Sequence, residues 1–193
     1  GNSIFKNTGD YESKINGVTI NYSGTANYNK WLFHTDAHNH ARTSAWNIGS
    51  GTKITMSGSK LAMYTSQFHS GSKDLEFTNG GTIEDTGTEN FIWFALAENS
   101  RGVYKDSRFT NTNTITLKGT KGIFAYIDMP TTSGAVSGSW NGRGVPEVIN
   151  GTGGSAANSN GWYITNTGTL DVGGSENTAV FVNDGWRYHK AKI

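Results

Sequence analysis

The chain has 193 residues, of which 26 are glycine and two are proline, with no cysteine and a formal net charge of +1. The lack of cysteine excludes disulfide scaffolds and thiolate metal sites. The near-zero charge argues against nucleic-acid binding, which normally requires a basic patch. Charged residues are only 16% of the chain, a balance typical of β-structure with polar turns.

A short pattern recurs along the chain, in which an aliphatic residue stands four positions before a glycine. The five copies are Ile20/Gly24, Ile54/Gly58, Ile83/Gly87, Ile115/Gly119 and Leu170/Gly174. The glycines stand 34, 29, 32 and 55 residues apart, and an apolar run rich in aromatic residues follows each one. A period of this size is typical of stacked repeats.

Each unit holds three strand-like runs and no helical periodicity, so stacking predicts three parallel sheets around one axis. The predicted fold is therefore all-β, a right-handed parallel β-helix of five to six rungs of about 30 residues with inserted loops. In chain order, we expect rungs at 15–33, 46–65, 75–96, 107–127 and 162–182. An antiparallel sandwich or barrel is the competing interpretation, but only stacking requires similar residues at the same place in each unit.

An apolar residue also stands six positions before four of the five aliphatic residues, at Ile48, Phe77, Phe109 and Ile164. The last three of these open a tripeptide that ends in Asn79, Asn111 and Asn166. We expect these asparagines to stack at equivalent turns.

Two stretches depart from the repeat, an inserted loop at 34–44 and a Gly/Ser/Asn-rich insertion at 129–161. The insertion explains the 55-residue gap, and a degenerate sixth rung around 145–151 is an open alternative. We expect residues 1–193 to form a single β-solenoid fragment of a longer protein that continues at both ends. Long elaborations on a regular scaffold are where function tends to lie.

The Thr-Asn-Thr-Gly-Thr-Leu stretch within 164–174 and the Gly-Ile-Phe-Ala-Tyr strand of 122–126 resemble the passenger repeats of type V autotransporters. They are most similar to the rungs of the large fusobacterial surface adhesins. The resemblance implies an exported passenger that is displayed on the outer membrane of a Gram-negative bacterium and serves in adhesion. Membrane attachment would then occur only through a C-terminal translocating barrel that this sequence lacks. The resemblance carries no specific binding residue onto this chain.

A first candidate site lies in the inserted loop, where His34, Asp36, His38 and His40 alternate. On an extended strand all four would share one face, with the nitrogen and oxygen ligands that Zn, Ni or Cu accept. The alternative is a polar loop that binds no metal, and we expect no cofactor.

A second candidate is a column of aromatic residues seven positions after the repeat glycine, namely Trp31, Phe94, Tyr126 and Phe181, with Tyr64 one place away. Aromatic rings along a β-surface can stack on sugar rings, but an interior stack would give the same sequence pattern. If 123, 125 and 127 face inward, Phe124 and Tyr126 face outward and become glycan-binding candidates.

A third candidate is the large insertion with Trp140, Arg143 and Glu147, followed by Trp162. Exposed Trp and Arg are favoured anchors in interfaces, so this stretch is a candidate partner-binding loop; a surface excursion without a partner is the alternative.

The sequence thus predicts a surface passenger segment that binds a host or bacterial glycan or protein, or that serves as a rigid stalk. The alternatives are a glycan-degrading β-helix enzyme and a glycan-binding module similar to phage tailspikes. Glycosidases need two converging carboxylates, and Glu84, Asp85 and Asp171 show no such pairing in the sequence. We therefore expect no enzymatic activity.

Overall fold

The computed structural model describes residues 2–7, 12–37, 44–68, 75–97, 107–129, 147–149 and 162–184. The elements in these ranges are all β-strands, as the sequence predicts. Within them no helix is long and apolar enough to cross a membrane.

The strands form three sheets, and every pairing between neighbours is parallel. Sheet A consists, in spatial order, of β1 (Asn2–Asn7), β4 (Lys30–Ala37), β7 (Ala62–Phe68), β10 (Phe91–Ala97), β13 (Ile123–Met129) and β17 (Thr178–Asp184). Sheet B consists of β2 (Glu12–Ile15), β5 (Ser44–Ile48), β8 (Leu75–Asn79), β11 (Ser107–Asn111), β15 (Trp162–Asn166) and β14 (Glu147–Ile149). Sheet C consists of β3 (Thr19–Tyr22), β6 (Lys53–Met56), β9 (Thr82–Asp85), β12 (Thr114–Leu117) and β16 (Thr169–Val172).

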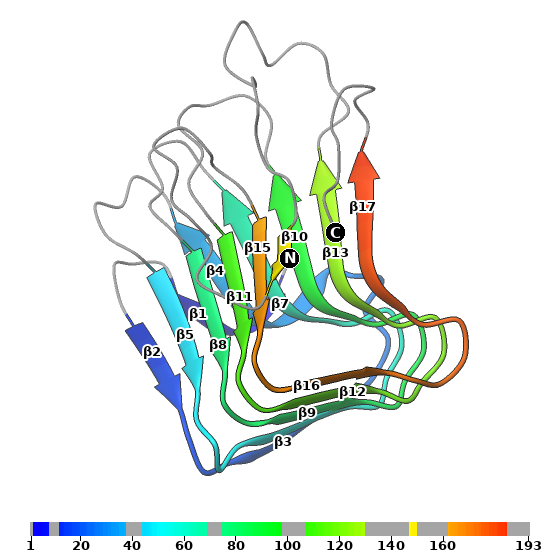
Figure 1. Cartoon of the computed structure of the whole chain (residues 1–193), viewed down its shortest axis with the longest axis horizontal. Coiled ribbons are helices and arrows are strands. Elements are labelled where there is room, and N and C mark those ends of the chain that lie inside the picture. Colours follow the sequence, from blue (N-terminus) through cyan, green and yellow to red (C-terminus); the bar gives the residue numbers. More distant parts are fainter. Residues whose placement is uncertain are drawn as a thin grey trace, which may run out of the picture.

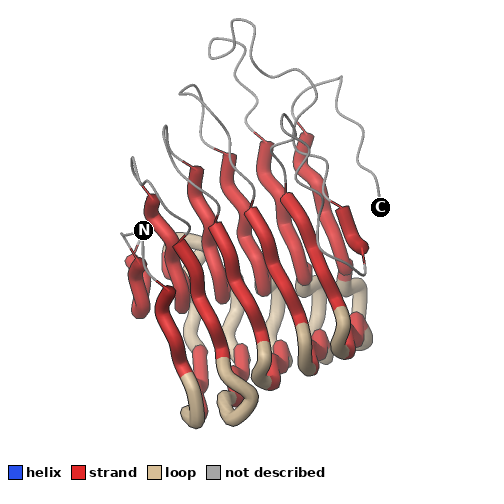
Figure 2. The backbone as a smooth tube through the Cα atoms, turned by 60° about the vertical axis from the view of Figure 1, so that its left-hand side comes forward, coloured by secondary structure: helices blue, strands red, loops and turns tan. Residues whose placement is uncertain are grey.

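The chain passes from sheet B through sheet C to sheet A and then begins the next turn (Figure 1). The described residues form five complete turns, from β2–β3–β4 to β15–β16–β17, and β1 precedes them on sheet A. The right-handed parallel β-helix is thus confirmed, and the antiparallel alternative is wrong because the ladders are parallel throughout. Figure 2 shows the turns stacked side by side along the axis.

Equivalent residues of the sequence repeat are partners in the ladders between successive turns. The aliphatic residues of the pattern lie directly opposite one another on sheet C, in the order Ile20, Ile54, Ile83, Ile115 and Leu170. The repeat glycines follow at the corner between sheets C and A. A Cβ atom on Gly87 would overlap the carbonyl oxygen of Gly58, and one on Gly119 would overlap that of Gly87. Close approach of successive turns therefore requires glycine there.

The interior is filled by apolar and aromatic side chains from all three sheets. Phe77 and Phe109 stack with ring centroids 4.9 Å apart, and Tyr64 lies 4.6 Å from Phe77. Rings at such distances contribute packing beyond simple area burial. The core is therefore continuous along the axis.

The predicted asparagine stack is present at the corner between sheets B and C. Asn79 Nδ2 donates to Asn111 Oδ1 at 2.8 Å, and Asn111 Nδ2 donates to Asn166 Oδ1 at 2.7 Å. One alignment from the sequence was wrong: Ile48 lies opposite Asn79, and Trp46 lies opposite Phe77. The turn after β5, residues 49–52, is two residues longer than the turn at 80–81. A fixed spacing of six residues before the aliphatic residue therefore selects Ile48 in place of Trp46.

The alternative of a sixth rung near 145–151 is wrong in its position. β11 pairs directly with β15, so no strand lies between them, and β14 pairs with the outer edge of β15. The insertion thus supplies a strand to sheet B beyond the fifth turn (Figure 1).

Candidate functional site

The corner between sheets A and B differs from the other two corners in the length of its connections. Sheet B is joined to sheet C by residues 16–18, 49–52, 80–81, 112–113 and 167–168, and sheet C to sheet A by 23–29, 57–61, 86–90, 118–122 and 173–177. Sheet A is joined to sheet B by residues 8–11, 38–43, 69–74 and 98–106, and by the long stretch 130–161, which contains β14. The two predicted insertions therefore both lie at one corner, which we call the A–B corner.

Buried hydroxyl groups lie inside the β-helix beside the A–B corner. Ser66 Oγ accepts hydrogen bonds from Trp93 Nε1 at 3.0 Å and from Ser107 Oγ at 3.1 Å. Thr35 lies opposite Ser66 in the ladder, and Tyr64, two residues before Ser66, is fully buried. Burial raises the pKa of Tyr64, so its phenol stays neutral. These groups are all uncharged at neutral pH, and the two hydrogen bonds of Ser66 Oγ link β7 to β10 and β11.

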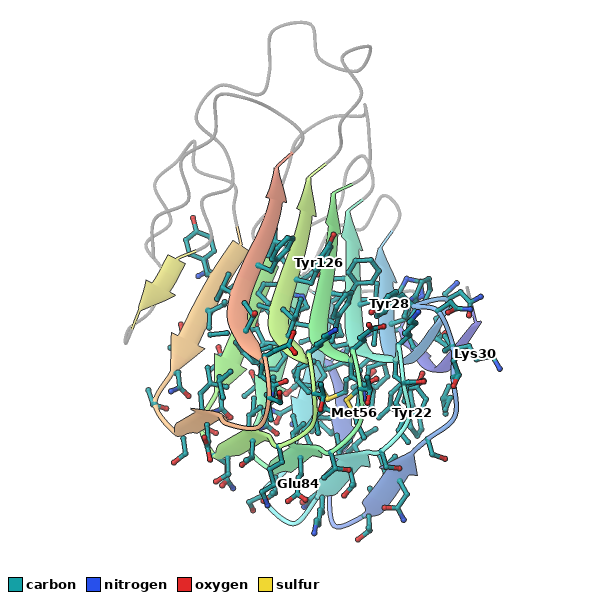
Figure 3. The ribbon with its side chains drawn as sticks, turned by 90° about the vertical axis from the view of Figure 1, so that its right-hand side faces the viewer. Tyr22, Tyr28, Lys30, Met56, Glu84 and Tyr126 are labelled. Atoms are coloured by element: carbon teal, nitrogen blue, oxygen red, sulfur yellow. The ribbon has the colours of Figure 1, made fainter. Side chains whose placement is uncertain are left out.

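An outer aromatic ladder runs along the solvent-facing side of sheet A. Tyr28 stacks on Phe91 with ring centroids 4.3 Å apart, Phe91 on Tyr126 at 4.7 Å, and Tyr126 on Phe181 at 5.3 Å. The rings are nearly parallel, with interplanar angles of 5°, 8° and 13°. Figure 3 shows Tyr28 and Tyr126 on the sheet A side.

This geometry limits what the ladder can bind. A ring that stacks on a sugar must present its face, and the faces of Phe91 and Tyr126 are covered by neighbouring rings. Phe91 is 7% exposed, whereas Phe181 at the end of the ladder is 45% exposed. The ladder therefore acts mainly as a stabilising spine, and Phe181 is its accessible ring.

The structure separates the members of the aromatic column that the sequence grouped together. Phe94, Tyr126 and Phe181 do align on sheet A, but Tyr64 points into the core. Trp31 aligns through Ala62 with Phe91. Thr25 pairs with Ser59, and Trp31 pairs with Ala62. Trp31 nevertheless stands six residues after Thr25, whereas Ala62 stands only three residues after Ser59, so the turn before Trp31 is longer.

Phe124 cannot serve as a surface ligand contact, because it is 1% exposed and packs edge-on against Phe109 at 5.2 Å. Tyr126 is half-buried on the outer side. The predicted alternation of inward and outward side chains along β13 is wrong, because the successive residues Phe124 and Ala125 both lie in the core. Sequence reasoning missed Tyr28 and Phe91; the longer turn before Trp31 is the signal that could have revealed Tyr28.

The predicted metal ligands are only partly within the described residues. His34 lies in β4, is 5% exposed and has its ring 4.5 Å from that of Trp31. Asp36 is in the same strand, opposite Gln67. His38 and His40 lie outside the described residues, and within those residues no group of three His, Cys, Asp or Glu side chains could hold a metal ion.

The insertion candidates are placed only in part. Glu147 is in β14 opposite Tyr163, and Trp162 is in β15 opposite Ser107. Trp140 and Arg143 lie outside the described residues. The structure therefore brings Glu147 and Trp162 onto adjacent strands of sheet B, next to the A–B corner.

Two carboxylates of sheet C that are far apart in the sequence lie in the same register column. Glu84 and Asp171 share an outer column, with Thr116 between them, which separates their strands by about 9.6 Å. Glu84 forms an ion pair with Lys118 at 3.2 Å, and Asp171 is exposed (Figure 3 labels Glu84). A glycosidase general acid needs a shielded, apolar environment, and neither side chain has one.

Asp85 points the other way, into the core, where it is fully buried. Its Oδ1 accepts hydrogen bonds from Asn90 Nδ2 at 2.8 Å and from the backbone N–H of Gly87 at 3.0 Å. Burial raises the pKa of Asp85, against the opposing effect of these two hydrogen bonds. The carboxylate is inaccessible to a substrate, so it is a structural group.

No family model matches this chain, and no curated protein or solved structure matches it either.

Proposed function

We propose that this chain is a rigid segment of a surface-displayed passenger whose A–B corner segments mediate adhesion to a glycan or glycoprotein of a host or bacterial surface. The observation that carries the proposal is that the two longest connections of the β-helix, residues 98–106 and 130–161, both leave from the A–B corner. Variable segments on a rigid scaffold are a common arrangement for binding.

The scaffold has the rigidity that such a role needs. Continuous parallel ladders run through three sheets, the asparagine stack links successive turns at the B–C corner, and the outer aromatic ladder links them on sheet A. A binding segment held on such a frame loses less conformational entropy on binding than a free one. The resemblance to autotransporter passengers supports the same role and implies display outside the outer membrane.

A rigid stalk without a ligand of its own is the main alternative. The two roles differ in what the A–B corner does, because a stalk requires only the ladders. Catalysis has less support, because Glu84 is ion-paired, Asp85 is buried and Asp171 is exposed on a sheet surface.

The test is a glycan and glycoprotein array probed with the whole chain and with variants. In two variants, residues 98–106 or 130–145 are replaced by Gly/Ser segments of equal length, which leaves every described strand in place. The matched control is Thr116→Ala on the outer face of sheet C. Binding that is lost in a corner variant and kept in the control supports the proposal.

Two other outcomes would contradict it. Binding that survives both replacements but is lost in Phe181→Ala would move the site to the end of the outer aromatic ladder. No binding by the intact chain would favour the stalk.

A further inference from the structure

The strand β14 occupies an unusual place for a segment of an insertion. It precedes β15 in the sequence, yet it pairs with the edge of β15 that faces away from the other turns. The pairing is parallel, with Glu147 opposite Tyr163, Val148 opposite Ile164 and Ile149 opposite Thr165. A sixth turn of the β-helix would need that edge for its own sheet B strand.

The sequence of β14 and the two residues after it resembles that of a sheet B strand. Glu147-Val148-Ile149 is followed in the chain by Asn-Gly, as Glu76-Phe77-Thr78 in β8 is followed by Asn79-Gly80. The register places Val148 in the column of Phe77, Phe109 and Ile164, which are all fully buried. Two independent observations, the pairing and the motif, therefore identify β14 as a copy of the repeat's own strand.

The asparagine stack shows why that motif fits the edge of β15. Asn79 Nδ2 and Asn111 Nδ2 each donate to the asparagine of the next turn. The Nδ2 of Asn166 donates to Gly168 O, and within the described part of the chain it has no asparagine above it. The edge therefore presents a backbone ladder and a side-chain donor suited to a strand that ends in asparagine.

We propose that β14 is a built-in capping strand: it fills the place of a following turn's sheet B strand and blocks the edge of β15 against strands of other molecules. The site is a strand-binding edge, and the partner it fits is an extended, parallel segment with an apolar residue two positions before an asparagine. Such edges promote association between chains when they are left open.

The first experiment measures amide hydrogen exchange of the full chain over residues 162–166. Val148→Asp puts a charge at the register position of the buried Ile164, whereas the control Ile149→Asp puts the same charge opposite the half-buried Thr165. We expect Val148→Asp to speed exchange about tenfold or more, as an exposed edge does, and the control to change it much less. Equal exchange in the wild type and Val148→Asp would overturn the proposal.

The second experiment uses a fluorescent peptide with the sequence of residues 145–153. We expect the Val148→Asp chain to bind it and the wild-type chain to bind at least about tenfold more weakly, because the edge is already occupied. A peptide of residues 74–82 carries the same motif and should also bind, and a scrambled peptide should not.

Circular dichroism and the melting temperature show whether the variant chain remains folded, which we expect because the strands of the five turns pair with one another without β14. Equal peptide binding by the wild type and the variant, or binding of the scrambled peptide, would overturn the proposal. Failure of the folded variant to bind either motif peptide would do so as well.

Discussion

The two short corners of the β-helix bury polar side chains in different ways. At the B–C corner, Asn79, Asn111 and Asn166 bond to one another along the axis. At the C–A corner, Asp85 is the one buried acid among the described residues, and its neighbours in the ladder are Met56 and Leu117. Among the described residues Asp85 Oδ2 has no hydrogen-bond partner, although Oδ1 has two.

The difference shows why one polar residue can be repeated and the other cannot. An amide has both a donor and an acceptor, so identical residues in successive turns satisfy each other. An ionised carboxylate only accepts, so a column of aspartates would lack donors and repel itself. The contribution of the asparagine stack to stability should therefore not change with pH near neutrality, whereas Asp85 should make the stability of the fold depend on pH.

The largest effect is expected for Asn111→Leu, at the centre of the stack. Leucine has a similar volume but removes the bonds to Asn79 Nδ2, Asn166 Oδ1 and Thr169 O. We expect a loss of about 3–4 kcal/mol in the free energy of unfolding, because the substitution removes several hydrogen bonds that each contribute about 1 kcal/mol. Urea denaturation measures it, with Thr110→Ala on the adjacent outward position as control. A loss below about 1 kcal/mol would show that the stack contributes little.

This stack was predictable from the sequence because it depends on identity at a fixed spacing. A parallel ladder places the same residue of each turn in contact, so Phe-Thr-Asn at 77–79 and 109–111 predicted both register and contact. The first two turns were harder, since Ile15 and Ile48 occupy the asparagine position and are followed by longer turns. An Asn side chain that accepts a bond from the residue two positions later, as Asn79 does from Gly81, suits only the short turn.

The candidate site was less predictable. The sequence revealed the long segments at 34–44 and 129–161, but their common position at one corner depends on which strands form which sheet. Phe124 was misplaced because alternation breaks in the middle of the sheet A strands, and no local pattern signals that break. Tyr28 reaches Phe91 across a whole turn, where Ala62 is small enough to leave room.

The second largest effect is expected for Gly122→Ala, which tests how tightly Asp85 is held. A Cβ atom at Gly122 would lie 2.8 Å from Asp85 Oδ2, and the backbone of Gly122 is not left-handed. We expect a loss of about 2 kcal/mol from overpacking. In an Asp85→Ala background the same substitution should cost much less, which a double-mutant cycle of unfolding free energies measures. Equal costs in both backgrounds would mean that the carboxylate moves aside freely.

The pH dependence of stability is the third test. Because burial raises the pKa of Asp85 in the folded state, its protonated form favours folding below the unfolded pKa of about 4. That contribution is lost as the pH rises through the folded pKa. The free energy of unfolding should therefore fall relative to Asp85→Asn as the pH rises from about 4 through the folded-state pKa, by about 1.4 kcal/mol for each unit of pKa shift. Urea titrations at several pH values measure the difference between the two proteins. A difference that is constant with pH, or that moves in favour of the wild type as the pH rises, would contradict the assignment.

The smallest effect is expected for Asn166→Leu, at the end of the asparagine stack. Asn166 is only partly buried, and the substitution removes its bond to Gly168 O and one acceptor of Asn111 Nδ2. Asn111 Nδ2 keeps Asn113 O and Thr169 O as acceptors, so no buried donor loses all its partners. We expect a loss of about 1 kcal/mol, well below that of Asn111→Leu, measured by the same urea denaturation. Equal losses at the two positions would show that each asparagine acts through its own turn and not through the stack. The asparagines would then differ from Asp85 only in carrying no charge.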